Sequence, residues 1–169
     1  AWGQYDKALD YYQQALDAGW RVAPVYGQDN HLTPIYPYRT VAIAPELTPD
    51  SLLEALQARR VYSTDDPTLR VVFKLGKHWM GSVVSSNAES IVLTIFLESE
   101  RTIDKVEIFT CNAVCAQRKV VNARSVHWEP VVTVKEDTFF YLKITTRPKW
   151  LGTRRSIAVS APIWVQRTW

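Results

Sequence analysis

A carboxylate and an imidazole lie two positions apart in the run Gly27-Gln28-Asp29-Asn30-His31. In an extended chain, residues two apart project to the same side, so Asp29 and His31 could enter one cavity. A carboxylate oxygen with an imidazole nitrogen suits zinc, manganese or iron better than calcium. The same spacing also occurs in polar turns that an Asp side chain caps, so the motif alone leaves both interpretations open.

The remaining metal-binding residue types have simpler explanations. His78 and His127 have no other metal-binding residue close by in the sequence, so we expect structural roles for both. Cys111 and Cys115 form a single C-x3-C pair, without the second pair of ligands that a structural zinc site needs. We expect two free thiols or one local disulfide.

The elements that would position Asp29 and His31 begin with a helix. Apolar residues at three- and four-residue spacing predict an amphipathic helix over residues 5–16, and Gly19 suits its end. A short buried strand is expected at residues 21–26, immediately before the motif. Ligands in α/β folds gather beyond the carboxyl ends of strands, so this position favours a site.

A second strand and helix follow the motif. We expect a strand at residues 40–44, then a helix that Thr48 and Pro49 begin and that ends near Arg60. Alternating helices and strands are typical of an α/β layer. Two helices with two or three strands are too few to close a barrel, which indicates the edge of a larger domain.

From residue 67 onward the pattern changes to strands and turns. Six runs predict an antiparallel immunoglobulin-like β-sandwich. These runs are residues 69–75, 91–97, 103–111, 126–134, 139–145 and 156–165. The expected fold class is therefore α+β, with a short α/β segment over residues 1–66 and a sandwich over residues 67–169.

The charge distribution also changes near this boundary. Residues 1–64 hold 5 Lys and Arg against 7 Asp and Glu, whereas residues 65–169 hold 15 against 10. A basic cluster around Trp150 could bind nucleic acid through phosphate contacts and stacking. Its members are Lys143, Arg147, Lys149, Arg154 and Arg155. Because the net charge is only +3, a solvated loop explains the cluster equally well, and we expect no nucleic-acid partner. No apolar run approaches the ~20 residues that span a bilayer, so no membrane span is expected.

The order of motifs in residues 2–67 resembles the C-terminal part of the PHP family (polymerase and histidinol phosphatase) of metal-dependent hydrolases. The resemblance rests on the run from Trp20 to His31, on Tyr38-Arg39-Thr40, and on the segment from Leu47 to Thr64. The ending Ser160-Ala161-Pro162-Ile163-Trp164-Val165 is similar to the close of the β-domain that one branch of the family carries. The family's usual motif is Gly-Ser-Asp-x-His, and Gln28 stands here at the serine position.

The resemblance implies a distorted barrel of β/α units that holds two or three divalent metal ions. It implies hydrolysis of a small-molecule phosphoester, or of an amide or carbamate bond. Asp29 and His31 match the family's last pair of metal ligands. Arg39, Arg60 and Tyr62 follow in the chain, and we give them a substrate-binding role, since an Arg fork matches phosphate oxygens. For these residues helix capping and packing are the alternative.

The family's other ligands would precede Ala1, and two side chains cannot complete a catalytic metal site. The sequence therefore predicts a fragment that is inactive by itself and whose first partner is the missing N-terminal part of the same polypeptide. A non-catalytic β-sandwich binding module for carbohydrate or protein is the alternative. In that case Trp79 and Trp150, which lie in predicted turns, would form the binding platform.

Overall fold

A computed structural model describes residues 4–27, 38–113, 115–148 and 155–168 of the chain. In these residues the protein is mostly antiparallel β-sheet with two α-helices, α1 (Gln4–Asp17) and α2 (Pro49–Gln57), and one 3-10 turn, η1 (Cys111–Ala113). The strands are β1 (Arg39–Ala42), β2 (Val61–Thr64), β3 (Arg70–Leu75), β4 (His78–Trp79), β5 (Val83–Ser86), β6 (Ser90–Phe109), β7 (Cys115–Trp128), β8 (Val131–Thr133), β9 (Thr138–Thr146), β10 (Ser156–Ser160) and β11 (Ile163–Arg167).

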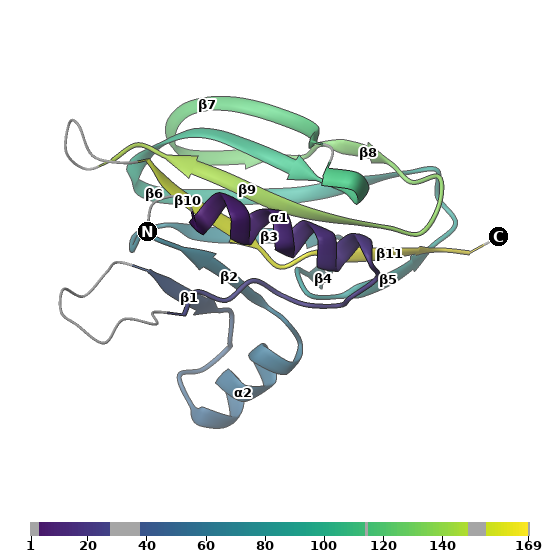
Figure 1. Cartoon of the computed structure of the whole chain (residues 1–169), viewed down its shortest axis with the longest axis horizontal. Helices are drawn as coiled ribbons and strands as arrows, with labels where there is room; N and C mark the ends of the chain where they lie inside the picture. The colour runs from purple at the N-terminus through teal and green to yellow at the C-terminus, as the bar shows by residue number, and fades with distance from the viewer. Residues whose placement is uncertain (1–3, 28–37, 114, 149–154, 169) are drawn as a thin grey trace.

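The strands form one curled sheet whose main path runs β1-β2-β10-β9-β6-β3-β4 (Figure 1). Strand β6 is the longest at 20 residues, and it pairs with β3 and β8 near its start and with β9 near its end. β7 pairs along most of β6, with three shifts of register. Among the described strands, β5 and β11 pair in parallel and the other pairs are antiparallel.

The two faces of the sheet carry separate apolar cores. On β9, Phe140, Leu142 and Ile144 point into the main core, whereas Phe139 and Tyr141 point to the opposite face. This division follows from the alternation of side chains along a strand. Helix α1 lies across that opposite face, where Leu16 packs against the second group of apolar side chains (Figure 1).

Helix α1 ends in the way that the sequence predicts. Gly19 has a φ of +84°, its N–H donates to Leu16 O at 2.9 Å, and Trp20 N donates to Ala15 O at 2.9 Å. This pair of bonds is a Schellman motif, for which glycine is favoured because it has no Cβ. The predicted end of the first helix is confirmed.

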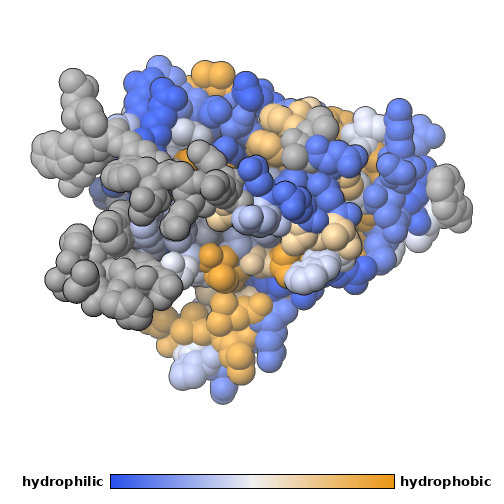
Figure 2. Space-filling view, in the orientation of Figure 1, coloured by the Kyte–Doolittle hydropathy of each residue, from blue (hydrophilic) through white to orange (hydrophobic). Residues whose placement is uncertain are grey.

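Helix α2 begins as expected, with the Thr48 side chain accepting the N–H of Ser51 at 3.3 Å and Pro49 at the first helical position. Ala55 is fully buried, but Leu53 is 56% exposed and Leu56 is 48% exposed. Leu47, just before the helix, is 91% exposed. The helix therefore projects from the sheet with an apolar surface of its own, which is visible in Figure 2.

The strand predicted at residues 21–26 is wrong, because these residues have no regular secondary structure. Pro24 has no N–H to give to a ladder, and the segment instead crosses the molecule from the end of α1 to β1 (Figure 1). Four predicted strands differ from those found, and one of them, at 126–134, covers the end of β7 and all of β8. The runs at 91–97 and 103–111 belong to one strand, β6, and the run at 156–165 is two strands, β10 and β11.

The sheet continues across the boundary expected near residue 66. Strand β2 pairs with β10, with Ala158 opposite Thr64 and Ser160 opposite Tyr62. The division into residues 1–66 and 67–169 stays a prediction, and a test follows in the Discussion. In the described part of the chain, no helix has the length and apolar character needed to cross a membrane.

Candidate functional site

Two tyrosines, Tyr26 and Tyr38, lie on either side of Asp29 and His31 in the sequence and contact one another. The rings of Tyr26 and Tyr38 stack with centroids 4.5 Å apart and planes 2° apart. The N–H of Tyr26 donates to Thr40 Oγ1 at 2.8 Å, which fastens the same point to β1. Tyr26 and Tyr38 therefore lie together beside the edge strand β1.

Asp29 and His31 themselves lie outside the described residues, so their metal-binding role stays a prediction. Within residues 4–27, 38–113, 115–148 and 155–168, no group of three or more His, Cys, Asp or Glu side chains is arranged to hold a metal ion. Cys111 and Cys115 are both free and half-buried.

Arg60 follows α2, and its side chain bonds to two nearby residues, Glu54 and Ile43. Its guanidinium forms a two-armed ion pair with the Glu54 carboxylate, and its Nε donates to Ile43 O at 3.1 Å. The hydrogen bonds between them raise the pKa of Arg60 and lower the pKa of Glu54. Arg60 thus joins the end of α2 to the residue after β1.

Tyr62 lies on β2 and points into the main core, with 3% of its surface exposed. Its hydroxyl donates to Leu69 O at 2.7 Å, and burial raises its pKa to about 12. Arg39 lies at the exposed start of β1, opposite Thr64. The structure therefore spreads the three predicted substrate-binding residues over the sheet edge, the core and the end of α2.

A buried carboxylate, Asp66, was absent from the sequence-based candidates. It is 1% exposed, and its oxygens accept bonds from Thr68 N (3.0 Å), Thr68 Oγ1 (2.8 Å), Ser99 Oγ (2.8 Å) and Thr146 Oγ1 (3.0 Å). Arg101 Nε lies 3.6 Å from Asp66 Oδ1. Every lone pair that faces the interior is used, so Asp66 ties together the turn before β3, β6 and β9 instead of offering a reactive group.

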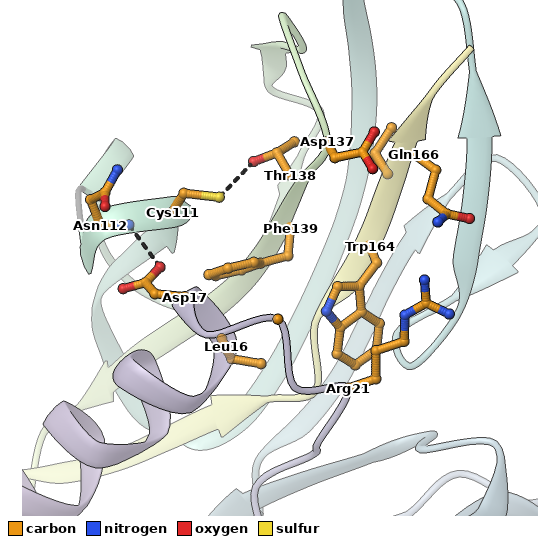
Figure 3. Close-up of a pocket in the computed structure, with 12 residues that line it drawn as sticks. Leu16, Asp17, Arg21, Cys111, Asn112, Asp137, Thr138, Phe139, Trp164 and Gln166 are labelled. Atoms are coloured by element: carbon orange, nitrogen blue, oxygen red, sulfur yellow. Dashed lines mark hydrogen bonds between the residues drawn. The ribbon is translucent and has the colours of Figure 1, made fainter.

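A hollow of about 260 Å³ opens between the end of α1 and strands β9 and β11 (Figure 3). Its lining combines aromatic, charged and thiol side chains from distant parts of the chain, and these are Leu16, Asp17, Gly19, Arg21, Cys111, Asn112, Asp137, Thr138, Phe139, Trp164, Val165 and Gln166. Sequence periodicity cannot reveal this hollow, since Asp17 and Asn112 in its walls lie 95 residues apart in the sequence.

Hydrogen bonds fix one wall of the hollow. Asp17 Oδ1 accepts the N–H of Asn112 at 2.8 Å and the amide of Gln13 at 3.0 Å. The sulfur of Cys111 lies 3.4 Å from Thr138 Oγ1. The end of α1 is thereby fastened to η1 and the start of β9, as the dashed lines in Figure 3 indicate.

The basic cluster is partly neutralised where the structure describes it. Asp104 pairs with Arg147 at 2.6 Å and with Arg155 at 3.1 Å. Glu107 lies opposite Lys143 across β6 and β9 and pairs with Lys105 at 3.0 Å and with Arg118 at 2.7 Å. These pairings lower the positive potential that a phosphate backbone would meet.

Of the two tryptophans expected to form an aromatic binding platform, the structure describes Trp79. Lys74 Nζ lies 3.9 Å from the ring centroid of Trp79, so a cation occupies one face of that ring. Trp150 lies outside the described residues. Trp164 is 7% exposed and belongs to the second core, as a strand position predicts.

Comparison with known proteins gives no relative for this chain. No protein-family model matches it, and neither does any curated protein or solved structure that was compared.

Proposed function

We propose that this chain is the C-terminal part of a metal-dependent hydrolase of the PHP type, acting on a phosphoester or on an amide or carbamate bond. Residues 1–66 would form the last α/β edge of the hydrolase barrel. Residues 67–169 would form an accessory domain of immunoglobulin-like type. Asp29 and His31 would supply two of the ligands to a cluster of zinc, manganese or iron.

The observation that carries the proposal is the stacked pair Tyr26 and Tyr38, 4.5 Å apart, on either side of Asp29 and His31 in the sequence. A segment whose flanking residues are fixed loses less conformational entropy when its side chains bind a ligand. The bond from Tyr26 N to Thr40 Oγ1 holds Tyr26 against a sheet edge. A metal site needs its ligating side chains to be held in position by rigid elements of this kind.

The chain's own residues would have distinct tasks at this site. Asp29 would hold a metal ion through its carboxylate and His31 through a neutral ring nitrogen. When bound, such ions activate water and stabilise the negative charge that develops during hydrolysis. Arg39 is exposed at the start of β1 and would contact the anionic part of a substrate, whereas Arg60 and Tyr62, engaged by Glu54 and Leu69, would support the site from behind.

The exposed leucines of α2 also support the proposal. Three leucines in or just before α2 expose about half of their surface or more, and these are Leu47, Leu53 and Leu56. They lie near β1, which is the last strand at one end of the sheet path. Apolar patches of this kind commonly mark a contact with another protein surface. In the proposed hydrolase, the preceding β/α units would cover them.

The test is a comparison of four variants in the complete polypeptide, with metal content and phosphodiester hydrolysis as the two measurements. We expect Asp29→Asn and His31→Gln each to lower hydrolysis by about a hundredfold and to reduce bound metal, because even partners of metal ligands cost about tenfold to a hundredfold. Asp10→Asn and His127→Gln are matched controls at exposed positions on α1 and β7 and should leave both measurements unchanged. Unchanged metal content in both ligand variants would contradict the proposal.

The isolated chain provides a second test. It should show no turnover and at most weak metal binding, because two ligands do not complete a site. Tight stoichiometric metal with turnover in the isolated chain would refute the prediction that essential ligands lie elsewhere.

A further inference from the structure

Trp164 presents an unused hydrogen-bond donor to the hollow between α1 and β11. The side chain is 7% exposed, and its ring nitrogen has no hydrogen-bond partner among the described residues. In Figure 3 this nitrogen points toward the hollow that Trp164 lines. Since the indole N–H only donates, the group that meets it must be an acceptor.

Two cations lie near the Trp164 ring, and one of them, Arg21, lines the hollow. The guanidinium carbon of Arg59 lies 5.5 Å from the Trp164 ring centroid. Arg21 lines the hollow on the same side as Trp164 in Figure 3, is exposed, and has no hydrogen bond or ion pair with any described residue. A donor beside two guanidinium groups favours an acceptor that carries negative charge, of which a carboxylate is the simplest.

The opposite wall of the hollow has the reverse character. Asp17 lies across Phe139 from Trp164 in Figure 3, and only its Oδ1 accepts hydrogen bonds, from Gln13 and Asn112. Its Oδ2 has no donor among the described residues. Asp17 is also the last residue of α1, where the helix dipole is negative. Both features favour a cation, and Asp137 at the rim, which accepts Arg167 N at 2.7 Å, adds to them.

The floor between these walls is apolar. Leu16 and Phe139 are each at most 3% exposed, and Figure 3 shows both between Asp17 and Trp164. A ligand that touches both walls must therefore carry its two charges on either side of an apolar body. The volume, about 260 Å³, suits a small molecule.

We propose that this hollow binds a small zwitterion whose ammonium and carboxylate groups are separated by an apolar body, such as an ω-amino acid or a short peptide. The carboxylate accepts from Trp164 and pairs with Arg21, the ammonium pairs with Asp17, and the body covers Phe139. The proposal goes beyond the hydrolase function and does not depend on it.

The experiment titrates the chain with 6-aminohexanoate by calorimetry, beside hexylamine and hexanoate, which each keep one charge. We expect each single-charge analogue to bind about tenfold more weakly, since a hydrogen bond to a charged group contributes roughly 1.5–3 kcal/mol. The dipeptide Ala-Ala is titrated in parallel. Tighter binding of Ala-Ala than of 6-aminohexanoate would indicate a peptide ligand, and the reverse would indicate an ω-amino acid.

Two variants locate the binding. Trp164→Phe removes the N–H and keeps a ring, and Arg21→Gln changes an exposed residue that supports no other described group; each should weaken 6-aminohexanoate about tenfold. Arg124→Gln, exposed on β7, is the matched control and should bind as the original chain does. Absence of saturable binding by both zwitterions, or equal binding by Arg21→Gln and Arg124→Gln, would overturn the proposal.

Discussion

Three tyrosines show how strongly single residues depend on their surroundings. Burial raises the pKa of Tyr62 to about 12, and it also raises the pKa values of Tyr12 and Tyr141. In the unfolded chain these groups ionise near their ordinary pKa of about 10. Between about pH 10 and pH 12 the folded protein therefore holds protons that the unfolded chain releases.

From this difference we predict that stability falls as pH rises above about 10. Below the unfolded pKa the stabilisation is fully present, and for Tyr62 alone about 2 kcal/mol is lost by pH 12. Urea unfolding at a series of pH values from 8 to about 12 measures the effect. Tyr62→Phe should flatten part of this decline, and an identical decline in that variant would show that Tyr62 does not contribute.

Asp66 supports a second prediction at this scale. Its substitution by Ala leaves the N–H of Thr68 and three side-chain hydroxyls without their acceptor in the interior. We expect Asp66→Ala to lower the free energy of unfolding by about 3 kcal/mol, within the range for a broken buried charge network. Asp10→Ala, exposed on α1, should change it by no more than about 0.5 kcal/mol. Equal effects in the two variants would mean that the Asp66 bonds contribute no stability.

At the scale of elements, the turn before β5 is packed against the end of α2. Gly81 has a φ of +93°, and a Cβ built there would lie 2.3 Å from Ala58 O. The Gly81 N–H donates to Pro162 O at 2.6 Å, and Arg59 Nε donates to Gly81 O at 3.3 Å. No side chain fits between these backbones.

We therefore predict that Gly81→Ala destabilises the protein by about 3 kcal/mol or more, because backbone atoms must move to admit the methyl group. Gly76→Ala is the matched control. Gly76 also has a positive φ, +56°, but has open space around it, so only the conformational cost of about 1 kcal/mol applies. Thermal unfolding of both variants compares the two costs, and similar losses of Tm would contradict the close approach at Gly81.

At the scale of the whole molecule, the first 66 residues share their sheet with the rest. β2 pairs with β10, and Val61 and Tyr62 belong to the main core. We predict one cooperative unfolding transition in urea, with coincident curves by tryptophan fluorescence and by far-ultraviolet circular dichroism. Two separate transitions would instead show that the boundary expected near residue 66 divides independently stable units.

Local signals in the sequence were sufficient for both helices. Gly19 and Thr48 act through bonds to residues three positions away, so their effect can be predicted without the fold. The strand expected at residues 21–26 failed because apolar character alone does not provide a ladder partner. The continuity of β6 was missed because its central residues are polar.

The functional residues divide in the same way. The Asp29 and His31 pair is a local motif whose spacing leaves a metal site and a capped turn both open, and its metal-binding role stays a prediction. The hydrogen bond from Tyr62 to Leu69 O forms only in the folded chain. The bonds to Asp66 also depend on the fold, since Ser99 and Thr146 lie 33 and 80 residues from it.

The sequence by itself determined where the helices begin, where the first one ends and most strand positions, because each depends on neighbours along the chain. Only the tertiary structure decided that β2 joins β10, that Tyr62 lies in the core, and that Asp17, Arg21 and Trp164 surround one hollow. The physical reason is that strand pairing and packing join residues far apart in the chain, which no local pattern encodes.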